Sequence, residues 1–398
     1  MISHNLPETR PNDFTKVIPI VKDIIESVKT KGDNAIYELT EKLDKVKISN
    51  IKVSKEELNT QASKVDSKVK EAIDIAYEQL KAFHEMLVPP NIGGGYQGIS
   101  FGVVWKSIEK VGIYVPSGKY SYPSTLLMAG IPAKVAKVKE IYVASPPNQE
   151  GTINPALAYV AIKLGVNEVY KVGGAQAIAA LAYGTESVKK VYKIVGPGNI
   201  YVQAAKYLVS DVVSVDGIEG PTELVIIADQ SAKYDYVVLD MKAQAEHGPN
   251  TFIVLLSDSE ELIRKVEEKV RDDEKVYYII RTSNIEEAIE IANRIAPEHL
   301  SLYVKDPSSV IDKIVNAGAI SLGVTPPALI DYVAGPNHIL PTNGWAKVRG
   351  GITIYDFIKP IMYANLRDIN RQLLDASITL ANYEGFVTHA KSIGVRYE

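Results

Sequence analysis

Hydrophobic positions recur at three- and four-residue intervals near the start of the chain, with lysine and glutamate between them. This spacing predicts amphipathic helices over residues 14–46 and 55–87. The Pro89-Pro90 pair ends the helical stretch, because proline cannot continue a helix. Short β-branched runs follow and predict strands at 99–105 and 110–115.

An alternation of short apolar runs and helical segments then fills the middle of the chain. Such alternation indicates parallel, doubly wound sheets with helices on both faces, and the number of strands suits two sheets better than one. Beyond Gly344 the chain is expected to become helical again, from about 366 to 392. We therefore expect an α/β protein with two Rossmann-like domains, plus small helical segments at both ends. The predicted strands are 140–144, 168–172, 191–195, 212–215, 224–228, 252–256, 276–280, 300–304 and 319–322.

The chain contains one perfect dinucleotide fingerprint, at residues 93–98. The fingerprint works only between a strand and a helix, where the pyrophosphate meets the helix amino terminus. Here prolines precede it and a β-rich run follows, so we interpret it as a glycine-rich turn leading into a strand.

Three other glycine-containing loops have the right context, because each follows a predicted strand and precedes a helix. They are residues 116–118, 173–176 and 196–199. Ligands on doubly wound sheets collect at the carboxyl ends of strands, where glycine allows close approach of the backbone. The alternative for each loop is a tight turn without a ligand.

Charge and amino-acid composition limit the partners, nucleophiles and metal ligands that this protein could use. The formal net charge is −4, with 44 basic and 48 acidic residues interspersed, which gives no reason to expect nucleic acid or an anionic membrane as a partner. No secretory signal or membrane-spanning run is visible, so a cytoplasmic location is expected. The chain has no cysteine. Thiol nucleophiles and thiolate ligands are thereby excluded, and a bound metal would need nitrogen and oxygen ligands.

Four of the six histidines lie in polar clusters. Gln244 and His247, three residues apart at the end of a predicted helix, share one face like a pair of ligands, or else His247 caps the helix. Glu298 and His299 begin a strand and can form two proton-transfer groups, or else a surface pair.

The other two clusters also have an ordinary interpretation. Asp331 is a candidate oxygen ligand and His338 follows a Gly-Pro turn, although the segment also suits a plain polar loop. Glu384 and His389 lie near the carboxyl terminus, where a solvent-exposed histidine is the ordinary case. His4 and His84 receive no role.

Together these segments resemble the histidinol dehydrogenase family, and the resemblance runs from about Pro7 to Val395. It implies an enzyme that oxidises L-histidinol through L-histidinal to L-histidine with two NAD, in the last steps of histidine biosynthesis. The residues that carry it are 111–116 (VGIYVP), 172–181 (VGGAQAIAAL), 194–199 (IVGPGN), 244–249 (QAEHGP), 296–300 (APEHL), 335–338 (GPNH) and 340–342 (LPT).

The resemblance also implies the role of each site residue. Zinc would be bound by Gln244, His247, Asp331 and His389, and Glu298 and His299 would be the catalytic pair. NAD contacts would fall on Tyr114, Gln176 and Asn199. The family is a homodimer with shared active sites, in which the carboxyl-terminal tail completes the site of the partner. Substrate contacts would come from Thr222, Gln244, His247, Glu298, His299, Asp331, His338, Glu384 and His389.

The implied domain division places residues 23–108 and 223–351 in a first Rossmann-like domain with the zinc and catalytic residues. Residues 109–222 form the second, with the NAD loops. Residues 1–22 and 352–379 would form a small helical domain, and 380–398 the crossing tail. Two departures from the family stand out: Thr222 replaces a common serine, and Arg349 lies in a stretch that is usually small and serine-containing.

The chemistry implied by the resemblance is coherent. Zinc with nitrogen and oxygen ligands would orient histidinol through its amine and imidazole. His299 would take the alcohol proton, and Glu298 would activate water on the aldehyde, so no cysteine is needed. The alternatives are a zinc- and NAD-dependent dehydrogenase of the same fold that acts on another small polar alcohol, and a non-catalytic metal-binding protein.

Overall fold

The computed structural model describes residues 1–7, 14–117 and 121–396. The predicted loop residue Gly118 and the last two residues of the predicted tail lie outside these ranges. The chain forms two compact units, one made of Met1–Val88 and Ile108–Phe357 and the other of Pro89–Ser107 and Ile358–Glu398. Within the described residues, no helix is long and apolar enough to cross a membrane.

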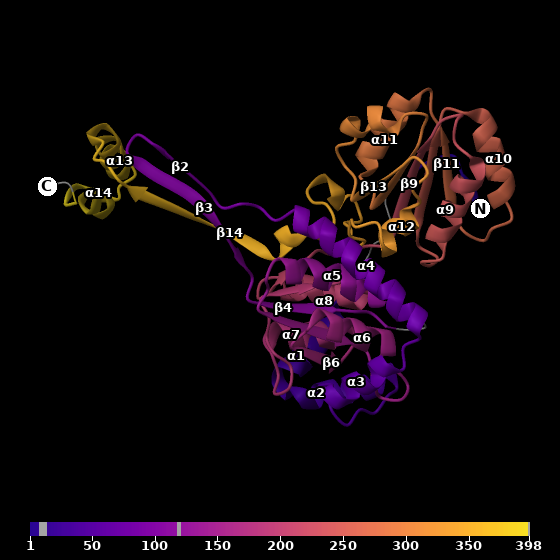
Figure 1. The fold of residues 1–398 in the computed structure, drawn as a ribbon, viewed down its shortest axis with the longest axis horizontal. Helices are drawn as coiled ribbons and strands as arrows, with labels where there is room; N and C mark the ends of the chain where they lie inside the picture. The colour runs from indigo at the N-terminus through magenta and orange to yellow at the C-terminus, as the bar shows by residue number, and fades with distance from the viewer. Residues whose placement is uncertain (8–13, 118–120, 397–398) are drawn as a thin grey trace. The chain divides into compact units, whose positions relative to one another are not determined.

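The first unit contains a parallel six-stranded sheet. Helices α9 (Tyr234–Ala245) and α10 (Glu260–Val270) cover one face and α11 (Ile285–Ile295) the other (Figure 1). Helix α12 (Pro327–Tyr332) follows the last strand. All residues of the central strands are buried, as the continuous apolar runs predicted. The strands, in spatial order, are β1 (Ile2–Ser3), β11 (Tyr277–Arg281), β10 (Phe252–Ser257), β9 (Glu223–Ala228), β12 (His299–Tyr303) and β13 (Ala319–Leu322).

The same unit contains a parallel five-stranded sheet. Two doubly wound parallel sheets confirm the predicted fold class, and the predicted strands agree with the observed ones to within two residues at either end. The strands, in spatial order, are β6 (Glu168–Lys171), β5 (Glu140–Ser145), β4 (Lys110–Tyr114), β7 (Lys193–Val195) and β8 (Ser214–Val215). The helices that connect them are α5 (Pro123–Val135), α6 (Pro155–Leu164), α7 (Gly174–Tyr183) and α8 (Ile200–Val209).

The amino-terminal helices are α1 (Ile18–Lys31), α2 (Asp33–Leu39), α3 (Lys55–Ser63) and α4 (Ser67–Met86). α1 packs on α7 and α8, and α3 packs on α6, so both belong to the body of the five-stranded sheet. The expected domain division had grouped residues 23–108 with the other sheet. Amphipathic spacing shows that a helix has a buried face but not which sheet that face covers.

The second unit is built on an antiparallel three-stranded sheet in the order β14 (Ile358–Leu366), β3 (Ile99–Ser107), β2 (Ile92–Tyr96). Helices α13 (Arg371–Tyr383) and α14 (Val387–Gly394) follow. Residues 352–379 had been assigned to a small helical domain, with a helix expected only from about 366. Residues 358–366 form strand β14, because they pair with β3 along its whole length. Gly93–Gly95 lie within β2, which turns at Gln97 and Gly98 into β3, so no helix follows the fingerprint.

Candidate functional site

A chain of hydrogen bonds links three of the predicted site residues at the amino ends of β9 and β12. The Gln244 Nε2 donates to Thr222 Oγ1 at 2.5 Å, and the Thr222 hydroxyl donates to Glu298 Oε2 at 2.5 Å. The amide of Glu223 donates to the same carboxylate oxygen at 2.8 Å. Because β9 and β12 are parallel neighbours, the residues that precede them in the chain, Thr222 and Glu298, are brought side by side.

Burial shifts the pKa values of the two proton-transfer candidates, Glu298 and His299, in opposite directions. Glu298 is buried, and the loss of solvation raises the pKa of its carboxyl well above the usual value, although the Thr222 hydrogen bond opposes this. His299 is also buried, and burial lowers its pKa to about 3, with His338 and His247 adding repulsion. The His299 imidazole is therefore neutral at pH 7, and its Nδ1 has no partner among the described residues.

Asp331 and His338 lie close to His299. Asp331 Oδ1 is 3.6 Å from His299 Nε2, and burial raises the pKa of Asp331 to about 7. His338 Nδ1 lies 2.8 Å from the Asp331 backbone carbonyl, which can only accept a hydrogen bond. Nδ1 of His338 therefore carries the proton, which leaves its Nε2 as an acceptor. Burial lowers the pKa of His338 to about 4, so this ring is also neutral at pH 7.

A cavity of about 840 Å³ lies beside these residues and is lined in part by Gln244, His247 and Asp331. These three side chains offer an amide oxygen, an imidazole nitrogen and a carboxylate oxygen as metal ligands. Zinc accepts ligands of all three kinds. Within the described residues no three His, Cys, Asp or Glu side chains come close enough together to form a complete metal site. The set therefore fits zinc, but only if a further ligand is supplied from elsewhere.

The predicted fourth ligand belongs to the second unit. His389 lies on α14, is exposed, and stacks on Phe386 with ring centroids 4.9 Å apart. Glu384 caps the end of α13 and is also exposed. Within the described residues, the side chain of neither Glu384 nor His389 makes a hydrogen bond or an ion pair.

The three predicted NAD residues lie at carboxyl ends of strands in the five-stranded sheet. Tyr114 ends β4, and its hydroxyl accepts a hydrogen bond from Gly174 N at 3.1 Å. Gln176 is buried near the start of α7, and its Oε1 has no partner in the described residues. Asn199 is exposed and caps α8. β4 and β7 are the strands at which the strand order reverses, which is where such sheets bind ligands.

One residue of the site was missed by the sequence reasoning. Glu223 is buried next to Thr222, and its carboxylate accepts hydrogen bonds from Glu298 N at 3.3 Å and Asn343 N at 2.9 Å. It thus holds the backbone at Glu298. The signal was a carboxylate at the first position of an otherwise apolar strand.

Comparison with known proteins identifies the family. The model of the family "Histidinol dehydrogenase" matches residues 8–397. The chain is 83% identical to a histidinol dehydrogenase of Saccharolobus solfataricus and 59% identical to one of Sulfolobus acidocaldarius, in each case over all of both chains. The crystal structure of histidinol dehydrogenase from Elizabethkingia anophelis superimposes with a TM-score of 0.92 at 32% identity, covering 99% of this chain and 97% of that one.

More distant likeness extends to an acetylating aldehyde dehydrogenase from Geobacillus thermoglucosidasius, with a TM-score of 0.50 at 13% identity over 91% of this chain and 100% of that one, which shows a shared fold only. The full-length match and the high identity to named relatives carry the assignment. The chain therefore belongs to the histidinol dehydrogenase family of NAD-dependent oxidoreductases.

Proposed function

We propose that this protein oxidises L-histidinol to L-histidine in two successive steps at one zinc site, with L-histidinal held between the steps and one NAD consumed in each. The observation that carries the proposal is the joining of Gln244, Thr222 and Glu298 by hydrogen bonds beside neutral His299, next to the cavity that Gln244, His247 and Asp331 line.

Zinc would be held by Gln244, His247 and Asp331 of one chain and by His389 of the partner subunit. When bound, it supplies a cation that orients the amine and imidazole nitrogens of histidinol. Its charge would also offset the cost of ionising buried Asp331, because the neighbouring His299 imidazole is neutral at pH 7. Glu384 of the partner subunit and His338 would contact the substrate beside the metal.

In the first step His299 would take the proton of the alcohol, and NAD, when bound, would accept the hydride. A neutral imidazole is required for this, and the burial of His299 keeps the ring neutral over the whole physiological range. The second step needs a base for the water that adds to the aldehyde. Glu298 suits this role because burial raises the proton affinity of its carboxylate.

NAD would bind along the loops that carry Tyr114, Gln176 and Asn199. Their position at the reversal of strand order supports this, as does buried Gln176, whose Oε1 has no hydrogen-bond partner among the residues that the structure describes. The glycines at 93–98 would take no part, because they lie in a hairpin. The proposal also includes a cytoplasmic location and no nucleic-acid or membrane partner.

The test is the rate of NADH formation with L-histidinol, with L-histidinal and with other small amino alcohols. We expect both histidinol and histidinal to be oxidised and activity to be lost on removal of zinc by a chelator and restored by zinc. A preference for an amino alcohol without an imidazole would overturn the substrate assignment. Turnover that survives complete metal removal would overturn the zinc assignment.

A further inference from the structure

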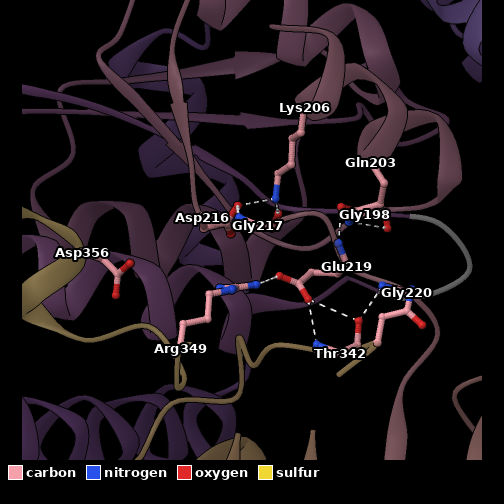
Figure 2. A network of polar contacts seen from close by, with 12 residues as sticks. Gly198, Gln203, Lys206, Asp216, Gly217, Glu219, Gly220, Thr342, Arg349 and Asp356 are labelled. Carbon is pink, nitrogen blue, oxygen red and sulfur yellow. Dashed lines mark hydrogen bonds and ion pairs between the residues drawn. The ribbon is translucent and has the colours of Figure 1, made fainter. Parts of the chain in front are cut away.

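Two buried side chains of α8 hold the loop that follows β7. Lys206 Nζ donates to the Gly196 carbonyl at 2.5 Å, and Gln203 Nε2 donates to the Gly198 carbonyl at 3.1 Å. Lys206 is fully buried and Gln203 nearly so. Both ends of the 196–198 backbone are thus fastened to the helix that Asn199 caps (Figure 2).

The charge of Lys206 is matched by Asp216, in the segment that follows β8. Lys206 Nζ lies 2.5 Å from Asp216 Oδ1, and neither side chain is exposed. The other oxygen, Asp216 Oδ2, accepts the Gly196 amide at 2.7 Å. The two side chains of this ion pair therefore form hydrogen bonds with both the N–H and the C=O of Gly196.

A residue with a side chain would fit at position 196 only if the neighbouring backbone moved. Its φ of +123° is unfavourable for residues with a side chain, and a Cβ there would lie 2.0 Å from the backbone oxygen of Tyr114. The loop thus packs directly on the residue that ends β4. The burial also shows that Lys206 has no access to the phosphates of a dinucleotide, so its contribution is to geometry.

The segment that begins at Asp216 leads directly into strand β9, which Thr222 precedes. The Glu219 amide donates to Gln203 Oε1 at 2.7 Å, and Glu219 Oε2 accepts from Thr342 N at 3.0 Å. Its other oxygen pairs with Arg349, the residue that departs from the family pattern. Three residues further on, Thr222 donates to Glu298. Figure 2 shows the polar contacts from Lys206 to Thr342 and Arg349 as one network.

We propose that Lys206, Asp216 and Gln203 are positioning residues for the dinucleotide. They fix the 196–199 loop and, through the 216–222 segment, hold it in register with Thr222 and Glu298, so that the nicotinamide meets the substrate. This inference rests on the proposed assignment of the Asn199 loop to NAD.

The test compares Lys206→Met with the neutral pair Lys206→Met/Asp216→Asn and with Gln203→Met. The double variant avoids an unpaired buried carboxylate, and Gln203→Met removes no charge, so folded protein is available even if the single lysine variant fails. We expect each folded variant to raise the KM for NAD by about tenfold or more, with weaker equilibrium binding of NADH, while the KM for histidinol stays within about twofold.

Lys193→Met is the matched control. Lys193 is a buried lysine at the opposite end of the same strand β7, paired with Asp356 at 3.1 Å. A comparable loss of thermal stability without a change in NAD affinity is expected there. NAD affinity equal to wild type in folded Gln203→Met and the double variant would overturn the positioning role.

Asn199→Ala separates this inference from the function on which it rests. If Asn199→Ala weakens NADH binding but the α8 variants do not, the loop binds NAD and only the positioning role falls. If Asn199→Ala and the α8 variants all leave NADH binding unchanged, the loop does not contact the dinucleotide, and both the inference and the proposed NAD assignment fall.

Discussion

Glu298 and His299 are adjacent in the sequence and both buried, yet burial raises the pKa of Glu298 and lowers that of His299. The physical cause is the same, because low polarity disfavours whichever form carries charge. The proposed mechanism uses both results: His299 is a neutral base, and the carboxylate of Glu298 binds a proton more tightly than an exposed glutamate does.

Glu298→Gln should separate the two oxidation steps. An amide cannot accept a proton from water, whereas its shape and its hydrogen bond from Thr222 can persist. Oxidation of histidinal should therefore fall about 10²-fold or more, and the first oxidation of histidinol should fall much less. Single-turnover NADH formation with each substrate measures this directly. Equal slowing of both reactions would contradict the division of labour between Glu298 and His299.

His84 offers a test at a residue with no proposed function. Its ring is fully buried on α4, neither nitrogen has a partner in the described residues, and burial lowers its pKa to about 4, with Asp356 opposing. Because the folded pKa lies below the unfolded value of 6.5, the folded state binds fewer protons between these values. Stability is therefore lost as pH falls from about 6.5 towards 4.

His84→Met should remove this acid sensitivity. Between pH 7.5 and pH 5 the wild type should lose about 2 kcal/mol more of its free energy of unfolding than the variant does. Denaturant unfolding at the two pH values measures the difference. His4→Met is the control, since His4 is exposed, and it should leave the pH dependence unchanged. An identical pH dependence in His84→Met and the wild type would show that the lowered pKa of His84 does not cause the loss of stability at acid pH.

At the scale of elements, the site uses opposite ends of the two parallel sheets. The loops proposed to bind NAD follow the carboxyl ends of β4, β6 and β7, in accordance with the general rule for such folds. Thr222 and Glu298 instead precede β9 and β12, so the proposed proton-transfer residues lie at the amino edge of the six-stranded sheet. The segment that joins β8 to β9 connects the two regions directly.

Two glycine variants distinguish the 196–199 loop, which we propose to bind NAD, from the fingerprint sequence at 93–98. Gly196→Ala places a Cβ against the Tyr114 backbone and should raise the KM for NAD by about tenfold or more. Gly95→Ala lies in β2, where the nearest atom would be the Ile99 carbonyl oxygen at 3.3 Å, and should affect stability more than NAD affinity. Initial-rate kinetics at varied NAD test both. A rise in the KM for NAD confined to Gly95→Ala would reverse the assignment.

At the scale of the whole molecule, the proposed zinc site needs two chains. His389→Ala and His247→Ala should each be inactive alone, yet a mixture that exchanges subunits should recover about a quarter of wild-type activity. About half of the dimers are then mixed, and each mixed dimer has one intact site of two. Activity and zinc content after exchange are the measurements.

The control mixture is His247→Ala with Asp331→Ala. Both ligands come from the same chain of each site, so every site in a mixed dimer lacks one of them and no activity should return. Recovery in this control, or a dead His389→Ala and His247→Ala mixture in which mixed dimers are demonstrated, would rule out the shared site.

The sequence by itself determined the two parallel sheets, because continuous apolar runs between amphipathic helices have few other stable arrangements. It also singled out Gln244, His247, Glu298, His299, Asp331 and His338, because they lie in short polar clusters of the sequence. The fingerprint at 93–98 could be rejected from its neighbours alone, because prolines precede it and a β-rich run follows.

Only the tertiary structure decided the rest. That β14 is a strand depends on its pairing with β3, more than 200 residues away in the chain. The packing of α1 and α3 on the five-stranded sheet, the role of Glu223 and the ion pairs of Lys206 and Arg349 likewise depend on distant partners. Local pattern fixes which face of an element is buried, but the identity of what covers that face is settled by long-range contacts that no local pattern encodes.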